Sequence, residues 1–274
     1  MRLAAFRAAV ALLLAVSGLG LGTGAAVAQA AAVAAADAAP PAPAAARVDS
    51  SAASLPAPRS PAGLRAYRAA LSATALRIAV SSEERQLWLL RGDRVLFTAY
   101  VAVGSGADFT FGGRRFHFET PRGVRHVLEK RVAPVWTVPD WHYYERAAAE
   151  DLPLVRMVAG RSYPLSDGTS LEVRGRQVGR VDAGGDFWPI DPGLEILLDG
   201  KLYMPPAGSA QRRVPGALGP FGLAMGNGYL IHGVHEYDAD SVGQAVSHGC
   251  VRMANDDLER LFGMVPVGTA VYIF

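Results

Sequence analysis

The C-terminal two thirds of the chain carries short apolar runs that are typical of β-strands. Residues 94–103 alternate between apolar and other side chains, as in a strand with one buried face, and the face is formed by Val95, Phe97, Ala99, Val101 and Val103. Gly92-Asp93, Asp167-Gly168 and Asp199-Gly200 lie between such runs and favour the positive φ angles of hairpin turns. We therefore expect strands at 76–80, 86–90, 94–103, 171–174, 195–198, 202–204, 229–232 and 269–274.

Two segments predict helices. Residues 141–151 are rich in alanine and follow Asp140, which we expect to be the N-cap. Residues 255–265 begin with Asn255 as the expected cap and present one apolar stripe, formed by Leu258, Leu261, Phe262 and Val265. Strands outnumber helices, which argues against a doubly wound nucleotide-binding fold. The fold class that we predict is mainly β, a sandwich or barrel with a few short helices.

The N-terminal segment predicts export. Arg2 and Arg7 precede an apolar run from residue 8 to residue 21, and Ala28-Gln29-Ala30 ends the segment with small residues, as a signal peptidase site does. We expect residues 1–30 to be a signal peptide cleaved after Ala30, so that the mature protein lies in the periplasm or the cell wall. The alternative is an uncleaved anchor, because residues 8–36 contain no charged side chain. Residues 31–73, rich in alanine and proline, predict a disordered linker, and residues 74–274 predict one domain.

Composition and charge exclude several classes of protein. Half of the 274 residues are hydrophobic and 19% are charged, which excludes a chain that is disordered throughout. The chain has 27 basic and 25 acidic residues, and removing the signal peptide leaves 25 of each. Such a balance lacks the positive excess of a nucleic-acid-binding protein, so we expect no nucleic acid as partner. A single cysteine, Cys250, excludes an intramolecular disulfide.

Candidate chemistry gathers between residues 232 and 252. His232 ends a predicted strand, and the segment Ser247-His248-Gly249-Cys250 follows it. A thiolate attacks a carbonyl carbon far better than a thiol does, and a free cysteine titrates near ~8.5, so Cys250 needs a neighbouring base or positive charge. Glycine at 249 allows a substrate backbone to approach, and the N–H groups of residues 249 and 250 are candidates for an oxyanion hole.

Two other interpretations of the cluster stay open at this point. A lone cysteine is often an inert core residue, although a polar segment flanked by glycine is not a core-strand pattern. Zinc is the second alternative, with four candidate ligands in His232, His235, His248 and Cys250. Their spacing does not match a zinc finger or ribbon, so we expect no metal. We interpret His235 as a surface residue and three scattered histidines as structural, namely His117, His126 and His142.

His232-Gly233, followed by Ser247-His248-Gly249-Cys250-Val251-Arg252, resembles the signature of the L,D-transpeptidase catalytic domain, a family that cross-links peptidoglycan with a cysteine nucleophile. The resemblance extends over most of residues 76–274, through Val101–Gly104, Thr120–Gly123, Pro134–Trp136, Leu218–Pro220 and Gly268–Val271. Residues 162–213 do not align with it, and we expect this insertion to form an extra hairpin over the cleft.

The resemblance implies a role for each residue of the motif. Cys250 corresponds to the nucleophile and His232 to the general base and acid, and the third group is a main-chain oxygen or a small polar residue next to the histidine, in the region of Gly233. His248, together with Ser247 and Gly249, corresponds to the oxyanion and substrate-positioning loop. Arg252 is placed to hold a substrate carboxylate or to brace that loop. Val234 stands where many members carry threonine or serine, so no side-chain role is expected there.

The activity that the resemblance implies is acyl transfer without a cofactor. Cys250 would attack a tetrapeptide stem of peptidoglycan and release D-alanine, and an amine would resolve the thioester. The acceptors that it allows are a second stem, a free D-amino acid and a lysine of an outer-membrane or wall-anchored protein. One alternative is a hydrolase that uses the same residues with water, a carboxypeptidase or an amidase that detaches protein from the wall. Another is a non-catalytic wall-binding or zinc module. We expect a monomer.

Overall fold

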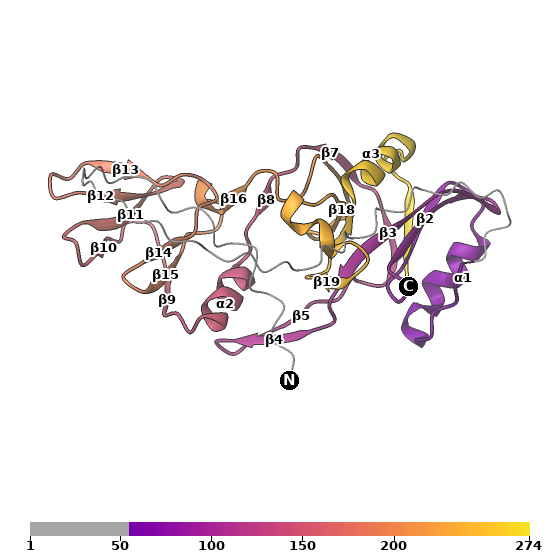
Figure 1. Ribbon diagram of the computed structural model, residues 1–274, viewed down its shortest axis with the longest axis horizontal. Coiled ribbons are helices and arrows are strands. Elements are labelled where there is room, and N and C mark those ends of the chain that lie inside the picture. Colours follow the sequence, from indigo (N-terminus) through magenta and orange to yellow (C-terminus); the bar gives the residue numbers. More distant parts are fainter. Residues whose placement is uncertain (1–54) are drawn as a thin grey trace, which may run out of the picture. The chain divides into compact units, whose positions relative to one another are not determined.

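The computed structural model describes residues 55–274. The predicted signal peptide and most of the predicted linker lie outside the described residues. Strands dominate the described part, which confirms the predicted mainly β class (Figure 1). The helical elements are η1 (Pro61–Gly63), α1 (Leu64–Ser72), α2 (Asp140–Ala149), η2 (Ala210–Arg212), η3 (Glu236–Ser241) and α3 (Asn255–Met264).

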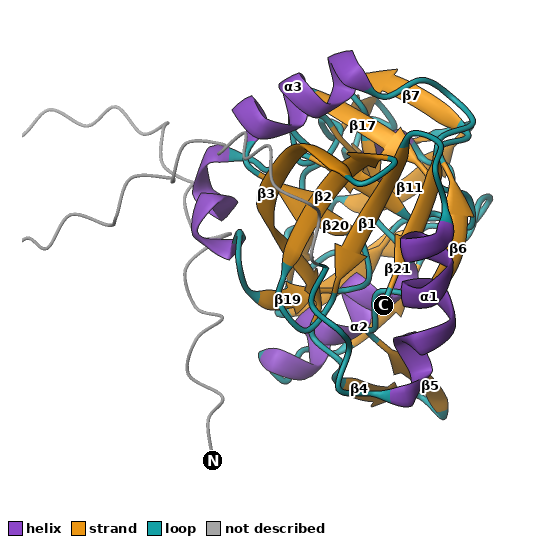
Figure 2. Cartoon of the chain, turned by 90° about the vertical axis from the view of Figure 1, so that its right-hand side faces the viewer, coloured by secondary structure: helices purple, strands orange, loops and turns teal. Residues whose placement is uncertain are grey.

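A single curled sheet forms the main body of the domain (Figure 2). Its edge strands, β6 and β7, follow each other in the sequence, so the sheet bends most of the way toward a closed barrel. β19 (Ala245–Ser247) pairs with β3 beside the main path. The order is β6 (Gly123–His126), β21 (Ala270–Ile273), β1 (Arg77–Ser81), β2 (Gln86–Arg91), β3 (Arg94–Gly104), β20 (Val251–Met253), β18 (Leu230–His232), β17 (Phe221–Ala224) and β7 (Glu129–Val132).

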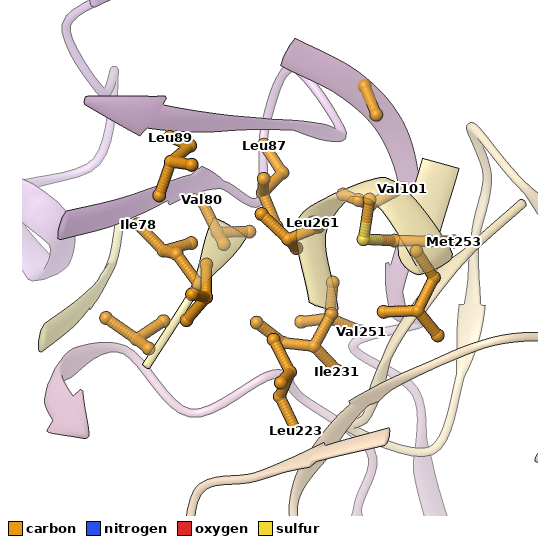
Figure 3. Packing of buried hydrophobic residues seen from close by; sticks show 14 of the residues in the cluster. Ile78, Val80, Leu87, Leu89, Val101, Leu223, Ile231, Val251, Met253 and Leu261 are labelled. Atoms are coloured by element: carbon orange, nitrogen blue, oxygen red, sulfur yellow. The ribbon is translucent and has the colours of Figure 1, made fainter. Parts of the chain in front are cut away.

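The concave face of the sheet encloses the main hydrophobic core (Figure 3). The predicted alternation of residues 94–103 is confirmed for Phe97, Ala99, Val101 and Val103, which are all buried in this core. Val95 packs instead in the cluster on the other face of the sheet. A bulge between Leu89 and Leu90 of the partner strand shifts the register, and such a shift moves the following side chain to the opposite face.

The second face of the sheet is covered by α1, which corrects the predicted linker. Ala66 and Ala70 of this helix are buried, and the ring of Tyr67 packs edge-to-face on Phe274 at 5.3 Å. Residues 55–73 are therefore part of the folded domain, because alanine-rich sequence forms a helix once an apolar surface covers it. None of the helices formed by residues 55–274 has the length and apolar character needed to cross a membrane.

The insertion forms a lobe with its own core instead of a single hairpin. One sheet contains β10 (Tyr163–Pro164), β11 (Ser170–Arg174), β12 (Gln177–Val181) and β13 (Phe187–Pro189). A second sheet contains β14 (Ile196–Leu198), β15 (Lys201–Met204) and β9 (Leu154–Arg156). The two sheets share a hydrophobic cluster that includes Met157, Leu171 and Tyr203. The predicted turn at Asp199-Gly200 is confirmed, since both residues have positive φ angles between β14 and β15.

Helix α2 lies between the lobe and the main sheet (Figure 1). Asp140 is its first residue and not its cap, because the carboxylate binds Arg212 at 2.7 Å and Arg156 at 3.2 Å. Arg146 of the same helix binds Glu195 of the lobe at 3.0 Å. Two short sheets complete this region, the hairpin of β4 (Asp108–Phe111) with β5 (Arg114–His117) and the pair of β8 (Trp136–Thr137) with β16 (Arg213–Val214).

Candidate active site

His232 ends β18, and Cys250 immediately precedes the neighbouring strand β20 of the main sheet. β18 and β20 are parallel, with Ile231 aligned to Val251 and His232 aligned to Arg252. Ile231 and Val251 are buried in the main core. Because side chains alternate along a strand, His232 and Cys250 emerge on the opposite face, with Cys250 two positions before the residue aligned with His232. The register of β18 and β20 thus places the two residues at adjoining strand ends, and their action as a pair stays a prediction.

The imidazole of His232 is held in one protonation form. It is buried, and its Nδ1 lies 2.6 Å from the carbonyl oxygen of Gly233. A carbonyl can only accept a hydrogen bond, so Nδ1 carries the proton and Nε2 of the neutral ring keeps its lone pair. Burial lowers the pKa of His232 to about 4, and the positive charge of Arg252 acts in the same direction. At neutral pH the ring is therefore a neutral base with Nε2 as the accepting atom.

The Cys250 side chain is half-buried and rests as a thiol. Burial raises its pKa above the ordinary value, whereas a hydrogen bond from the Leu230 N–H and the charge of Arg252 lower it. The sulfur donates to the carbonyl oxygen of Gly228 at 3.8 Å, and within residues 55–274 no hydrogen bond joins it to the His232 ring. The raised pKa of Cys250 and the lowered pKa of His232 both disfavour a resting thiolate–imidazolium pair. The thiol proton must therefore leave the sulfur as it attacks a substrate.

Ser247 braces the loop that carries the nucleophile. Its buried hydroxyl donates to the Cys250 carbonyl at 2.6 Å and accepts from the Gly249 N–H at 3.1 Å. The Gly249 N–H is thus engaged, and it is not free to bind an oxyanion in this arrangement. Gly249 has a φ of +128°, and a Cβ there would lie 2.8 Å from the Tyr229 ring. Glycine is needed at this position to admit Tyr229, a reason that differs from the expected approach of a substrate backbone.

Asn255, which the sequence predicts as the cap of α3, binds the backbone beside His232 instead. It is the first residue of α3 and does not cap the helix. Its side-chain oxygen accepts from the Val234 N–H at 2.9 Å, and its side-chain nitrogen donates to the Val234 carbonyl at 3.0 Å. A Cβ on Gly233 would lie 2.2 Å from the same oxygen. Asn255 therefore fixes the backbone whose Gly233 carbonyl orients His232.

His248 sits in an aromatic pocket that no local sequence signal predicts. Its ring stacks on Trp141 at 4.0 Å and meets the edge of Phe118 at 4.5 Å. Its Nε2 lies 2.8 Å from Oε2 of Glu145, a residue of α2 that is 103 positions away in the sequence. His142, expected to be structural, lies beside Trp141 and Trp136 in the same region, and burial lowers its pKa to about 4.

The sequence of the chain matches a known family over most of the folded domain. The model of the L,D-transpeptidase catalytic domain, also called YkuD, matches residues 75–273. The chain belongs to this family. The match begins two residues before β1 and ends at the last residue of β21, so it covers the main sheet and both residues of the candidate pair.

Curated relatives of the L,D-transpeptidase family share parts of this sequence. The probable L,D-transpeptidase ErfK/SrfK of Salmonella typhimurium is 32% identical over 138 residues, which are 48% of this chain and 40% of that protein. The putative L,D-transpeptidase YkuD of Bacillus licheniformis is 45% identical over 65 residues, 22% of this chain and 38% of that protein. The chain thus spans less than half the length of these curated relatives.

Solved structures of L,D-transpeptidases are more distant in sequence. The L,D-transpeptidase from Xylanimonas cellulosilytica is 16% identical with a TM-score of 0.38, covering 81% of this chain and 65% of that one. The catalytic domain of the Enterococcus faecium enzyme is 16% identical with a TM-score of 0.37, covering 74% of this chain and 99% of that one.

The guanidinium of Arg252, the last residue of the family motif, has no partner within residues 55–274. Within residues 55–274 its guanidinium forms neither a hydrogen bond nor an ion pair, although it lies between His232 of β18 and Ala102 of β3. Its charge acts on Cys250 and on His232. A cation without a protein partner beside the nucleophile is suited to bind a carboxylate of a substrate.

The remaining histidines make other contacts or are exposed. His235 is half-buried at the start of η3, where its ring stacks on Tyr237. His117 is exposed and binds Asp108 and Glu119, and His126 is exposed on β6. In the described part of the chain, no three side chains among His, Cys, Asp and Glu are grouped so as to hold a metal ion.

A cavity of about 280 Å³, lined by both polar and apolar groups, lies at the end of β3. Its wall includes Ser105, whose N–H donates to the Ser247 carbonyl at 2.9 Å. Arg122 also lines it, and one guanidinium nitrogen, Nη1, is buried without a hydrogen-bond partner in the described residues. Ser105 thus connects the wall of this cavity to the loop that carries Cys250.

Proposed function

We propose that the protein is an exported L,D-transpeptidase that uses Cys250 to acylate itself with a tetrapeptide stem of peptidoglycan. The observation that carries the proposal is the hydrogen bond from His232 Nδ1 to the Gly233 carbonyl, since it leaves Nε2 as a base on the face that presents Cys250. Membership of the L,D-transpeptidase family supports the same chemistry. The substrate, the acceptor and the location are part of the proposal.

In the first half-reaction the Cys250 sulfur attacks the carbonyl carbon that joins diaminopimelate to the terminal D-alanine. The thiol proton passes to Nε2 of His232 as the C–S bond forms. The C–N bond then breaks, and the proton leaves on the amine of D-alanine, so a thioester remains and His232 is neutral again. No cofactor takes part in this sequence of steps.

In the second half-reaction an amine attacks the thioester. His232 removes a proton from the attacking nitrogen and returns it to the sulfur, which leaves as the thiol. The neutral form that burial imposes on His232 suits both halves, because the ring must start each one without the proton. The acceptor amine belongs to a second stem, to a free D-amino acid or to a lysine of an envelope protein. Water in place of the amine would give hydrolysis.

The test is incubation of the purified protein with disaccharide tetrapeptides, followed by mass spectrometry of the products. We expect a cross-linked dimer that has lost one D-alanine, and a thioester adduct at Cys250 in the intact protein. The Cys250→Ala variant is the control and should produce neither. Tripeptide without dimer would identify a hydrolase, and unchanged tetrapeptide would overturn the proposal.

Export is tested separately by sequencing the N-terminus of the protein recovered from the cell envelope. We expect cleavage between Ala30 and Ala31. An intact Met1 on the envelope protein would identify an anchor instead of a signal peptide.

A further inference from the structure

The histidine that precedes the nucleophile by two residues is tied to a distant carboxylate. Nε2 of His248 and Oε2 of Glu145 are 2.8 Å apart, although the loop and α2 are separated by 103 positions. The stacked Trp141 ring and the edge of Phe118 leave the imidazole little freedom to turn. The contact is partly shielded, since the side chains of His248 and Glu145 are 21% and 33% exposed.

We propose that Glu145 is a positioning residue of the active site, which acts through His248 on the loop that carries Cys250. The inference rests on the proposed transpeptidase function. A carboxylate can only accept a hydrogen bond, so it keeps a proton on Nε2 of His248 whether the ring is neutral or charged. The free nitrogen of the neutral ring is then Nδ1, and the orientation of the ring is set from α2.

Glu145 is not needed to hold α2 in place, which separates positioning from simple anchoring. Two ion pairs hold the helix. Asp140, its first residue, binds Arg212 at 2.7 Å, and Arg146, near its centre, binds Glu195 at 3.0 Å. Both partners belong to the inserted segment, with Glu195 immediately before β14 and Arg212 immediately before β16. These two ion pairs hold the helix without Glu145, whose carboxylate binds His248 instead.

The other ionisable groups around His248 do not replace Glu145. His142 lies close enough for its charge to interact with His248, but its pKa of about 4 leaves it neutral at neutral pH. The guanidinium of Arg146 is engaged by Glu150 and Glu195. Within residues 55–274, Glu145 is the one acidic side chain whose carboxylate lies within hydrogen-bond distance of the His248 ring.

The first experiment compares Glu145→Gln and Glu145→Ala with the matched control Glu150→Gln. Glu150 lies at the C-cap of the same helix and is half-exposed, so the control removes an equal charge without touching His248. We expect kcat with tetrapeptide stems to fall about 10–100-fold in both Glu145 variants, the range typical of a lost partner that orients a functional histidine, with KM nearly unchanged. The control should keep the kcat of the unmodified protein.

Two further measurements separate positioning from a loss of structure. Nitrogen-15 NMR of the histidine rings, with His248 assigned by a His248→Gln variant, should show a protonated Nε2 in the unmodified protein and a mixture of tautomers in Glu145→Ala. The double variant Glu145→Gln with His248→Gln should be no slower than His248→Gln alone, because Glu145 acts through that ring.

An unchanged His248 tautomer in Glu145→Ala, or losses that multiply in the double variant, would overturn the inference. Equal losses in Glu150→Gln and Glu145→Gln would do the same, since any charge on the helix would then suffice. The NMR measurement needs no substrate. Absence of turnover in the unmodified protein would therefore count against the transpeptidase proposal and leave the tautomer test of Glu145 intact.

Discussion

The carboxamide of Asn255 binds both main-chain groups of Val234, at 2.9 Å to the N–H and 3.0 Å to the carbonyl. This pair of bonds joins the start of α3 to the segment that follows β18. The carbonyl of Gly233, the residue before Val234, accepts a hydrogen bond from Nδ1 of His232. The orientation of the base thus depends on a side chain that lies 21 positions away from Val234 in the sequence.

Asn255→Ala should lower both stability and turnover. The change leaves the N–H and carbonyl of the buried Val234 without partners, at a cost of about 2 kcal/mol in the free energy of unfolding, and it frees the Gly233 carbonyl to move. Urea denaturation measures the first effect and the rate of stem-peptide conversion the second. Asp256→Asn, at the next and exposed position, is the control and should change neither by much. Full activity in Asn255→Ala would contradict the assigned role.

Cys250 and His232 should behave as one catalytic unit. Cys250→Ala and His232→Ala should each remove nearly all turnover, and the double variant should be little slower than either, because each step needs both groups. His235→Ala, which alters a residue outside the pair, should keep its activity. A carbapenem should add one adduct to the protein, mapped by mass spectrometry to Cys250, the only cysteine of the chain. An adduct elsewhere, or turnover by Cys250→Ala, would refute the mechanism.

The buried His232 should make stability depend on pH between about 6.5 and about 4. Its pKa in the folded protein is about 4, against 6.5 for an unburied histidine, so in this window the unfolded chain binds a proton that the folded one does not. The contribution of His232 is therefore complete above pH 6.5 and is lost as the pH drops, by about 3 kcal/mol over the window, and His142, whose pKa is also about 4, adds to the decline of the whole protein. Urea denaturation at several pH values measures it.

The variant His232→Gln should show a smaller decline over the same window, whereas His126→Gln, at an exposed position on β6, should decline as the unmodified protein does. The comparison uses the change with pH in each variant, so a uniform loss of stability in His232→Gln does not affect it. Equal declines in all three proteins would mean that His232 titrates normally.

Arg252→Met should weaken substrate binding more than it slows the chemical step. The guanidinium has no partner among residues 55–274 and lies on the face that presents Cys250, where a free carboxylate of the stem can reach it. Loss of one charge-assisted hydrogen bond costs about 1.5–3 kcal/mol, so KM for tetrapeptide stems should rise by about 10–100-fold. Steady-state kinetics measure it. A variant with unchanged KM would instead favour a role in bracing the loop.

Metal removal should leave activity unchanged. The mechanism uses a thiol and an imidazole and includes no step that needs a Lewis acid. Elemental analysis of the purified protein should find less than stoichiometric zinc, and dialysis against a chelator should not reduce the rate of stem-peptide conversion. Stoichiometric zinc whose removal abolishes activity would restore the interpretation of the cluster as a metal site.

Local sequence patterns predicted the long strands because a buried face imposes its period on the residues themselves. The alternation of residues 94–103 and the Asp199-Gly200 turn are both read directly from neighbouring positions, and both occur in the structure. Strands of two to four half-exposed residues, such as β5 and β7, carry no such period and were missed. The helix α1 was missed for another reason, since its alanines form a helix only against the apolar surface that includes Phe274.

Cys250, Ser247 and the strand that ends at His232 form a compact local signature whose chemistry follows from residue type, so the candidate nucleophile and base can be predicted from the amino-acid sequence. The groups that surround them follow from the fold. The sequence predicts Asn255 as a helix cap and gives no signal for Glu145, yet both bind groups that the fold brings from elsewhere in the chain. Hydrogen bonds of this kind join residues that are far apart in the sequence and close in space. A pattern of neighbouring residues therefore cannot predict them.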